Sequence, residues 1–213
     1  MVKEYSRHLL VIALGFVAGL LVFFEVFGPY LQWDGERGEP YSARILTLFG
    51  LPATASAIVL LVRSLQRRPT GGSPTETADA AVRSIVFWVV CFLVGVHALL
   101  LAVLLQIEGI LPLASRAVIV LLGVTLIGVG NLLPRTRPNM AFGIRTTRTL
   151  ADRRLWMITH RTSGYVVVAI GVVTILSGLL EDGVQIAQWP VLACAAGAIV
   201  LLVTYRRVAR VRS

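Results

Sequence analysis

Six long apolar stretches constrain the fold of this chain more than any other feature. A helix that crosses the hydrocarbon core of a membrane needs about 20 predominantly apolar residues. Such stretches cover residues 8–27, 45–62, 84–106, 113–133, 163–180 and 187–205. Only 15% of the 213 residues are charged, whereas soluble domains carry about a quarter. The sequence therefore predicts an all-α fold, a polytopic membrane helix bundle with six transmembrane helices.

The positions of the arginines predict the orientation of these spans. Lys3 and Arg7 precede the first span, and most arginines lie in the even-numbered connections and the C-terminal tail. The odd-numbered connections contain only Arg37, Arg44 and Arg116. By the positive-inside rule, we expect a cell-membrane protein with both termini in the cytoplasm. The net charge of +9 then reflects topology and contact with the lipid bilayer, and we expect no direct binding of nucleic acid.

One polar connection predicts how the chain is divided. Residues 66–80, QRRPTGGSPTETADA, are rich in Pro, Gly, Ser and Thr, a composition typical of flexible segments. We expect a flexible cytoplasmic linker over residues 66–83. It separates an N-terminal two-helix membrane segment (1–65) from a four-helix module (84–213) whose polar loop covers residues 134–162.

The segment 131–164 contains seven arginines, two prolines, a histidine and a tryptophan within otherwise apolar sequence. Pro134 is expected to end the fourth helix because proline lacks a backbone donor and clashes with the preceding turn. Pro138 favours extended geometry for the residue before it, so we expect a non-helical exit. Gly143 permits a turn or a close backbone approach.

A short helix is predicted after this exit. Thr149 followed by Asp152 resembles a capping box, which marks the start of a helix. Asp152, Trp156 and His160 recur every four residues and are therefore expected on one face. This helix either lies along the membrane interface or runs directly into the fifth span. Trp156 is also expected among the aromatic side chains at the inner membrane interface.

Some of the arginines have a simple explanation. Each one beside an anionic leaflet contributes about 1 kcal/mol to membrane anchoring. Those that fit this explanation are Arg135, Arg137, Arg153 and Arg154. Anchoring does not account for the prolines, Asn139 or the Trp156–His160 pair, so the loop is expected to need a defined shape.

The loop also contains a spaced set of residues: Asn131, Pro134, Pro138, Asn139, GIRT at 143–146, TL at 149–150, Trp156, THR at 159–161 and Gly164. This set resembles the signature of the SdpI family of multi-pass bacterial-type membrane proteins, approximately GNxxPxxxPNxxxGIRTPWTLxxxxxWxxTHRxxG. The spacing agrees without a gap from Gly130 onward, and the resemblance extends over roughly residues 84–205.

The resemblance implies immunity against a membrane-active peptide toxin on the outer face. The best-known member also signals by holding a transcriptional repressor at the membrane, which implies a cytosolic transcriptional regulator as a partner on the inner face. No cofactor, metal or catalytic residue is implied. The implied partner- or ligand-binding residues are Asn131, Pro134, Pro138, Asn139, Gly143, Arg145, Thr146, Trp156, Thr159, His160, Arg161 and Gly164.

Two parts of the chain depart from the resemblance. Thr147 and Arg148 stand where the family usually has Pro-Trp, so a partner at this corner meets an added charge in place of an interfacial anchor. In the front half, RGEPYSAR (37–44) and Trp33 weakly resemble a loop of a two-helix domain of unknown function, with Gln32 in place of its histidine.

Intramembrane residues give one further candidate. His97 lies near the middle of the third span, where an ionisable group is a functional hypothesis by default. It is either a neutral imidazole bonded to a neighbouring helix or a contact for a toxin or a proton. Cys91 and Cys194 lie in apolar runs without metal or redox spacing, so no metal site is expected.

Two alternative functions remain open. A small transporter or lipid-headgroup-binding protein would use Arg145 and Arg161, with Thr146 and Thr159, to bind a phosphate. An enzyme would use His160 as acid or base with Arg145 stabilising negative charge. Because no nucleophile, metal set or carboxylate pair accompanies them, we expect that the protein is not an enzyme.

Overall fold

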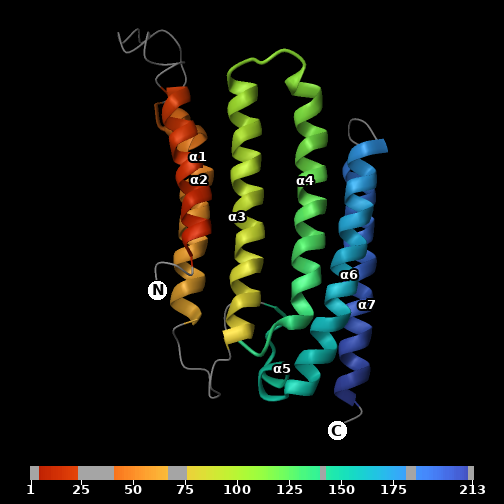
Figure 1. The fold of residues 1–213 in the computed structure, drawn as a ribbon. Coiled ribbons are helices and arrows are strands. Elements are labelled where there is room, and N and C mark those ends of the chain that lie inside the picture. Colours follow the sequence, from red (N-terminus) through yellow and green to blue (C-terminus); the bar gives the residue numbers. More distant parts are fainter. Residues whose placement is uncertain (1–4, 24–40, 67–75, 140–142, 181–185, 211–213) are drawn as a thin grey trace.

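The computed structural model describes residues 5–23, 41–66, 76–139, 143–180 and 186–210. All regular secondary structure in these ranges is helical, which confirms the predicted all-α class (Figure 1). The elements are α1 (Ser6–Val22), α2 (Tyr41–Gln66), α3 (Glu76–Leu104), α4 (Ile110–Leu132), the 3₁₀ helix η3 (Leu133–Arg135), α5 (Thr147–Ala151), α6 (Arg153–Leu180) and α7 (Gln188–Arg210).

Five helical stretches are long and apolar enough to cross a membrane. They are Ile45–Gln66, Ala80–Leu104, Ile110–Arg135, Arg153–Leu180 and Gln188–Val208. The predicted first span is represented by α1, an apolar helix whose 17 residues are fewer than a span needs; residues 24–27 of that prediction lie outside the described residues. The chain is therefore a multi-pass membrane protein.

The long helices stand side by side, and consecutive helices run in opposite directions (Figure 1). α1 packs on α2 and α3, α3 on α4, α4 on α6, and α6 on α7. The small helix α5 lies at one end of the bundle, and the turn between α3 and α4 lies at the opposite end (Figure 1). We call these the α5 end and the opposite end.

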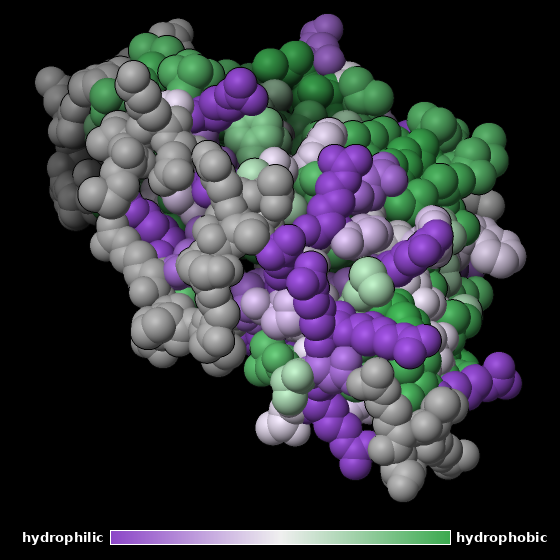
Figure 2. Space-filling model, turned by 60° about the horizontal axis from the view of Figure 1, so that its bottom comes forward, coloured by the Kyte–Doolittle hydropathy of each residue, from purple (hydrophilic) through white to green (hydrophobic). Residues whose placement is uncertain are grey.

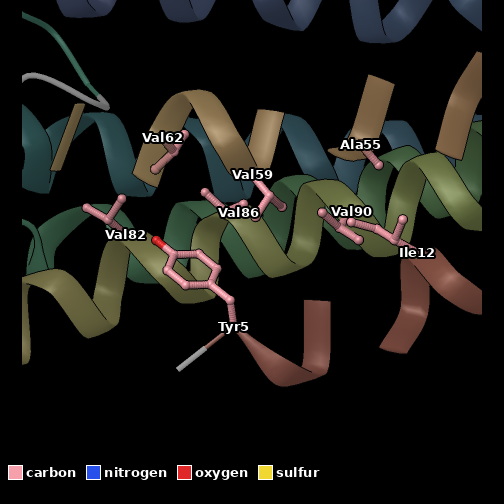
Figure 3. Close-up of a cluster of buried hydrophobic side chains, with 8 residues drawn as sticks. All are labelled: Tyr5, Ile12, Ala55, Val59, Val62, Val82, Val86 and Val90. Atoms are coloured by element: carbon pink, nitrogen blue, oxygen red, sulfur yellow. The ribbon is translucent and has the colours of Figure 1, made fainter. Parts of the chain in front are cut away.

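The front of the bundle, formed by α1, α2 and α3, has an apolar core. Valines of α2 and α3 interlock at spacings of three and four residues and contact the start of α1 (Figure 3). α3 thus packs on the front helices as well as on α4. It begins at Glu76, inside the predicted linker 66–83, while residues 67–75 lie outside the described residues. The core residues are Tyr5, Ile12, Ala55, Val59, Val62, Val82, Val86 and Val90.

Glycines allow α4 and α6 to pack closely in the C-terminal half of the bundle. A Cβ on Gly130 would lie 2.9 Å from the carbonyl oxygen of Gly164, and one on Gly164 would lie 2.8 Å from that of Gly130. Gly123 and Gly171 repeat this reciprocal contact seven residues away along each helix, at 2.7 and 2.8 Å. Since the two backbones touch, side chains larger than hydrogen are excluded at these positions, as is usual in tight membrane helix pairs.

Candidate functional site

The connection between α4 and α6, residues 133–152, forms the motif loop at the α5 end, with residues 140–142 outside the described ranges. α4 ends at Leu132, where Pro134 was expected to stop it. The exit was expected to be non-helical, and this is wrong for residues 133–135, which form η3 with Pro134 at its start. Proline suits this place because its missing N–H is not needed in a first turn. The chain becomes extended at Thr136.

Helix α5 is capped by two threonines. The backbone N–H of Thr149 donates to Thr146 Oγ1 at 3.1 Å, and the N–H of Thr146 donates to Thr149 Oγ1 at 2.8 Å. Thr149 Oγ1 also donates to the Ile144 carbonyl at 2.8 Å. The predicted capping box at Thr149 and Asp152 is therefore wrong: Thr146 is the N-cap, and Thr149 stands three residues inside the helix.

Asp152 separates α5 from α6. Its backbone is extended, and its Oδ1 accepts from the N–H groups of Arg154 at 2.8 Å and Leu155 at 3.2 Å. This caps the first turn of α6. α6 then continues without a break to Leu180, which confirms the second predicted arrangement, in which the helix of Trp156 and His160 runs directly into the fifth span.

Trp156 and His160 hold the motif loop against α6. Trp156 Nε1 donates to the Thr136 carbonyl at 3.1 Å, and the Ile144 N–H donates to His160 Nε2 at 3.2 Å. The two rings stack with centroids 3.8 Å apart. The pair therefore attaches the loop to α6 at two points, Thr136 and Ile144. Trp156 is 1% exposed, so its ring packs inside this contact and does not face lipid. Its predicted depth at the inner interface stays a prediction.

The hydrogen bonds of His160 define its tautomer. Nδ1 lies 3.0 Å from the Trp156 carbonyl, which only accepts, so Nδ1 carries the hydrogen. Nε2 then presents a lone pair to the Ile144 N–H. This is the neutral imidazole with one donor and one acceptor. Because both nitrogens bind backbone groups and the side chain is 1% exposed, the geometry gives no support to His160 as an acid or base.

Gly143 provides the space that this contact needs. Its φ is +103°, a value that favours glycine. A Cβ there would lie 2.0 Å from His160 Nε2. The close backbone approach predicted for Gly143 is therefore present, and His160 is the group that it approaches.

The C-terminal helix also reaches the motif loop. Tyr205 of α7 donates its hydroxyl hydrogen to Thr146 Oγ1 at 3.3 Å. Thr136, Thr149 and Tyr205 thus take part in the site although none was among the predicted site residues. Thr149 was recognised as a cap and as part of the family signature but not as a binding residue, and no local pattern links Thr136 or Tyr205 to the loop.

The predicted site residues divide into a buried, an exposed and a half-buried group. Trp156, Thr159, His160 and Gly164 are buried. Thr159 Oγ1 donates to backbone carbonyls of its own helix. Asn131, Pro134, Gly143, Arg145 and Arg161 are exposed. The remaining three, Pro138, Asn139 and Thr146, are half-buried.

Several predicted site residues make hydrogen bonds within the protein. Asn139 Nδ2 donates to the Arg137 carbonyl at 2.7 Å, a local turn contact. Arg161 Nε donates to the Tyr165 hydroxyl at 3.4 Å. The Thr146 and Thr159 hydroxyls are engaged inside the protein, which weakens the idea that they bind a phosphate together with Arg145 and Arg161.

His97 lies apart from this site, in the front of the bundle. It is 1% exposed. The Gly15 carbonyl of α1 faces it without meeting hydrogen-bond geometry, and neither ring nitrogen has a partner within the described ranges. The expected bond to a neighbouring helix is therefore absent from this part of the chain.

Arginines surround the motif loop on the outside. Figure 2 shows hydrophilic side chains gathered at the α5 end. The exposed arginines of this region are Arg135, Arg145, Arg148, Arg153, Arg154 and Arg161. The site is thus a buried, neutral Trp–His contact beneath a positively charged surface.

The comparison with known families agrees with this geometry. The model of the SdpI/YfhL protein family matches residues 135–205, from η3 through most of α7. Over this range the chain is similar to the SdpI/YfhL protein family. The matched range contains the Trp156–His160 pair, Gly143 and Tyr205, so the SdpI/YfhL region includes the whole hydrogen-bonded site. No curated protein and no solved structure matches the chain.

Proposed function

We propose that this membrane protein of the SdpI type confers resistance to a membrane-active peptide toxin and holds a cytosolic transcriptional regulator at its α5 end. The observation that carries the proposal is the rigid attachment of the motif loop to α6 by Trp156 and His160. A loop that served only to anchor the protein by charge would not need hydrogen bonds that attach it to α6 at two points. The proposed activity is binding without catalysis.

The distribution of charge supports a cytoplasmic α5 end. Most arginines of the described helices lie toward this end: those of the motif loop and also Arg7, Arg63 and Arg83. Arg116, in contrast, lies at the start of α4. Positive residues are enriched on the cytoplasmic side of membrane proteins. Both termini are then cytoplasmic.

Exposed arginines around α5 provide a surface for an acidic partner. Arg145 precedes α5 and Arg148 lies on it. Because α5 is capped by Thr146, packs on α6 and is joined to α7 through Thr146, these side chains project from a defined framework. A defined framework reduces the conformational entropy lost on binding.

The opposite end offers a place for an apolar peptide side chain. A cavity of about 150 Å³ lies between α6 and α7, lined by Val173, Leu176, Ser177, Leu180 and Trp189. Trp189 is 53% exposed. α6 and α7 both continue from this cavity to the motif loop, so a peptide that moved either helix would act on both ends of the protein.

Challenge of a toxin-sensitive bacterial host tests the proposal. Cells expressing the wild type are compared with Arg145→Ala and His160→Ala cells at equal membrane abundance. Arg153→Ala is the matched control, since it also removes an exposed arginine but lies outside the family signature. We expect the wild type and Arg153→Ala to protect, Arg145→Ala to lose regulator recruitment, and His160→Ala to lose both activities because the loop is released.

The outcomes separate the two parts of the proposal. Protection by all variants, with recruitment lost in Arg145→Ala, assigns the loop to signalling alone. Absence of protection by the wild type against a range of membrane-active peptides would reject immunity. The lipid-headgroup or transport function would then be the stronger candidate.

A further inference from the structure

A second group of polar side chains lies at the α5 end, where α1, α2 and α3 meet. Tyr5 and His8, at the start of α1, are only 6% and 4% exposed. The Tyr5 hydroxyl donates to Gln66 Oε1 at the end of α2 over 2.5 Å. His8 Nε2 lies 2.9 Å from the Arg83 carbonyl of α3. We call Tyr5, His8 and Gln66 the front polar cluster.

Two atoms of the front polar cluster lack partners. Because the Arg83 carbonyl only accepts, His8 Nε2 carries the hydrogen, and Nδ1 of the neutral ring presents a lone pair. His8 Nδ1 is buried and has no partner within the described parts of the chain. The same is true of Gln66 Nε2, an amide donor. Buried polar atoms are nearly always hydrogen-bonded, and leaving them unpaired is costly.

The chemistry of these two atoms limits what can satisfy them. His8 Nδ1 needs a donor, and Gln66 Nε2 needs an acceptor; a hydroxyl group supplies both. Tyr5 joins the two residues, since its ring centroid lies 4.9 Å from that of His8 and its hydroxyl binds Gln66. Both unpaired atoms therefore belong to one small region.

The positive charge around the front polar cluster adds a second requirement for its ligand. Arg83, whose backbone carbonyl contacts His8, carries a positive charge, and Arg7 is an exposed neighbour of His8 in the chain. Positive charge at the end of membrane-spanning helices favours anionic phosphate groups. A ligand that carries a hydroxyl beside a phosphate satisfies the unpaired atoms and this charge together.

We propose that the front polar cluster binds a hydroxyl-bearing phosphate ester, supplied either by the headgroup of phosphatidylglycerol or by free glycerol phosphate. The site is separate from the motif loop, and it does not depend on toxin resistance or on a regulator.

Native mass spectrometry of the delipidated full chain in detergent tests this site. Phosphatidylglycerol and phosphatidylcholine are added separately, and the retained lipid is counted. We expect the wild type to retain about ten times more phosphatidylglycerol, a ratio that the hydrogen bonds of its headgroup hydroxyl can provide. Free glycerol phosphate is then added as a competitor.

Two substitutions probe the unpaired atoms. Gln66→Glu keeps the acceptor for Tyr5 but removes the amide donor and adds a negative charge, so we expect the preference to disappear. Gln106→Glu makes the same change between α3 and α4, at the opposite end, and should leave it unaltered. His8→Phe removes both nitrogens but retains a ring beside Tyr5 and Phe87, and it should also lose the preference.

The results distinguish a lipid ligand from a soluble one, and they also test whether the site exists. Competition by glycerol phosphate supports the site with a soluble ligand, and preference without competition supports it with a lipid. Equal retention of the two lipids by the wild type overturns the proposal and leaves solvent as the occupant. So does an unchanged preference in both variants. If one variant loses helical content by circular dichroism, the other variant and the wild-type ratio still decide for or against the site.

Discussion

The imidazole of His160 stacks on the indole of Trp156 one helical turn away, with ring centroids 3.8 Å apart and ring planes 12° from parallel. Each ring also binds a backbone group of the motif loop, at Thr136 and at Ile144. Stacking sets the ring orientation that these two hydrogen bonds require. The pair thus converts two positions on one helix into two attachment points for a loop.

We predict that His160 is a neutral imidazole protonated at Nδ1 at neutral pH. The Trp156 carbonyl accepts from Nδ1, and Nε2 accepts from the Ile144 N–H. Nitrogen-15 NMR of the His160 side chain in detergent micelles distinguishes the tautomers. A signal from Nε2–H, or from the charged imidazolium, would contradict the geometry.

His160→Phe should destabilise the protein by about 1–3 kcal/mol, the cost of leaving buried backbone groups unpaired. The phenyl ring preserves stacking on Trp156 but accepts no hydrogen bond from Ile144. Reversible unfolding in mixed micelles measures the change. His97→Phe is the matched control, because the nitrogens of that buried histidine have no partner in the described ranges; it should be nearly neutral. Equal losses in the two variants would mean that the His160 bonds contribute nothing.

Gly143→Ala should release the motif loop. The φ of +103° strains any other residue, at about 1–3 kcal/mol, and the added Cβ would overlap His160 Nε2. Gly109→Ala provides the comparison, since Gly109 also has a positive φ of +71° but has no atom within 4 Å of an added Cβ. Faster hydrogen exchange of the Ile144 amide in Gly143→Ala alone is expected. Unchanged exchange of the Ile144 amide in Gly143→Ala would contradict the contact between Gly143 and His160.

Gly164→Ala should separate α4 from α6. Its Cβ would lie 2.8 Å from the Gly130 carbonyl and 2.9 Å from Pro134 Cγ, so the helices must move apart and lose packing. Gly50→Ala, in which the nearest atom is the flexible Leu46 Cδ1 at 3.1 Å, should be tolerated. Thermal unfolding monitored by circular dichroism compares them, and equal melting temperatures would contradict the glycine contact.

Tyr205→Phe should loosen α5 without unfolding the bundle. It removes the 3.3 Å hydrogen bond to Thr146, worth about 1 kcal/mol. Trypsin cleavage after Arg145 or Arg148 should then become several times faster. Tyr165→Phe removes a hydroxyl that contacts only the exposed Arg161 in the described hydrogen bonds and should leave cleavage unchanged. Acceleration in both variants would argue against a specific role for α7.

Some local features of the motif loop were predicted correctly and others were not. The predicted end of α4 near Pro134 was confirmed, because a proline disturbs the hydrogen bonding of the helix in which it lies. The cap was misplaced because Thr146, Thr149 and Asp152 all carry suitable side chains, and the choice depends on backbone geometry. Asp152 caps α6 in the structure, and α5 is a separate short helix that begins at Thr147 with Thr146 as its N-cap.

The sequence alone determined five of the six predicted membrane helices, and it placed Trp156 and His160 on one helical face, because apolar length and helical periodicity are properties of neighbouring residues. It also placed the arginines in the connections that meet at one end. Only the tertiary structure decided that His160 accepts from Ile144, that Gly130 meets Gly164, and that Tyr205 reaches Thr146, 59 residues away. These contacts join separate segments, and their geometry depends on how closely the backbones of α4, α6 and α7 approach one another.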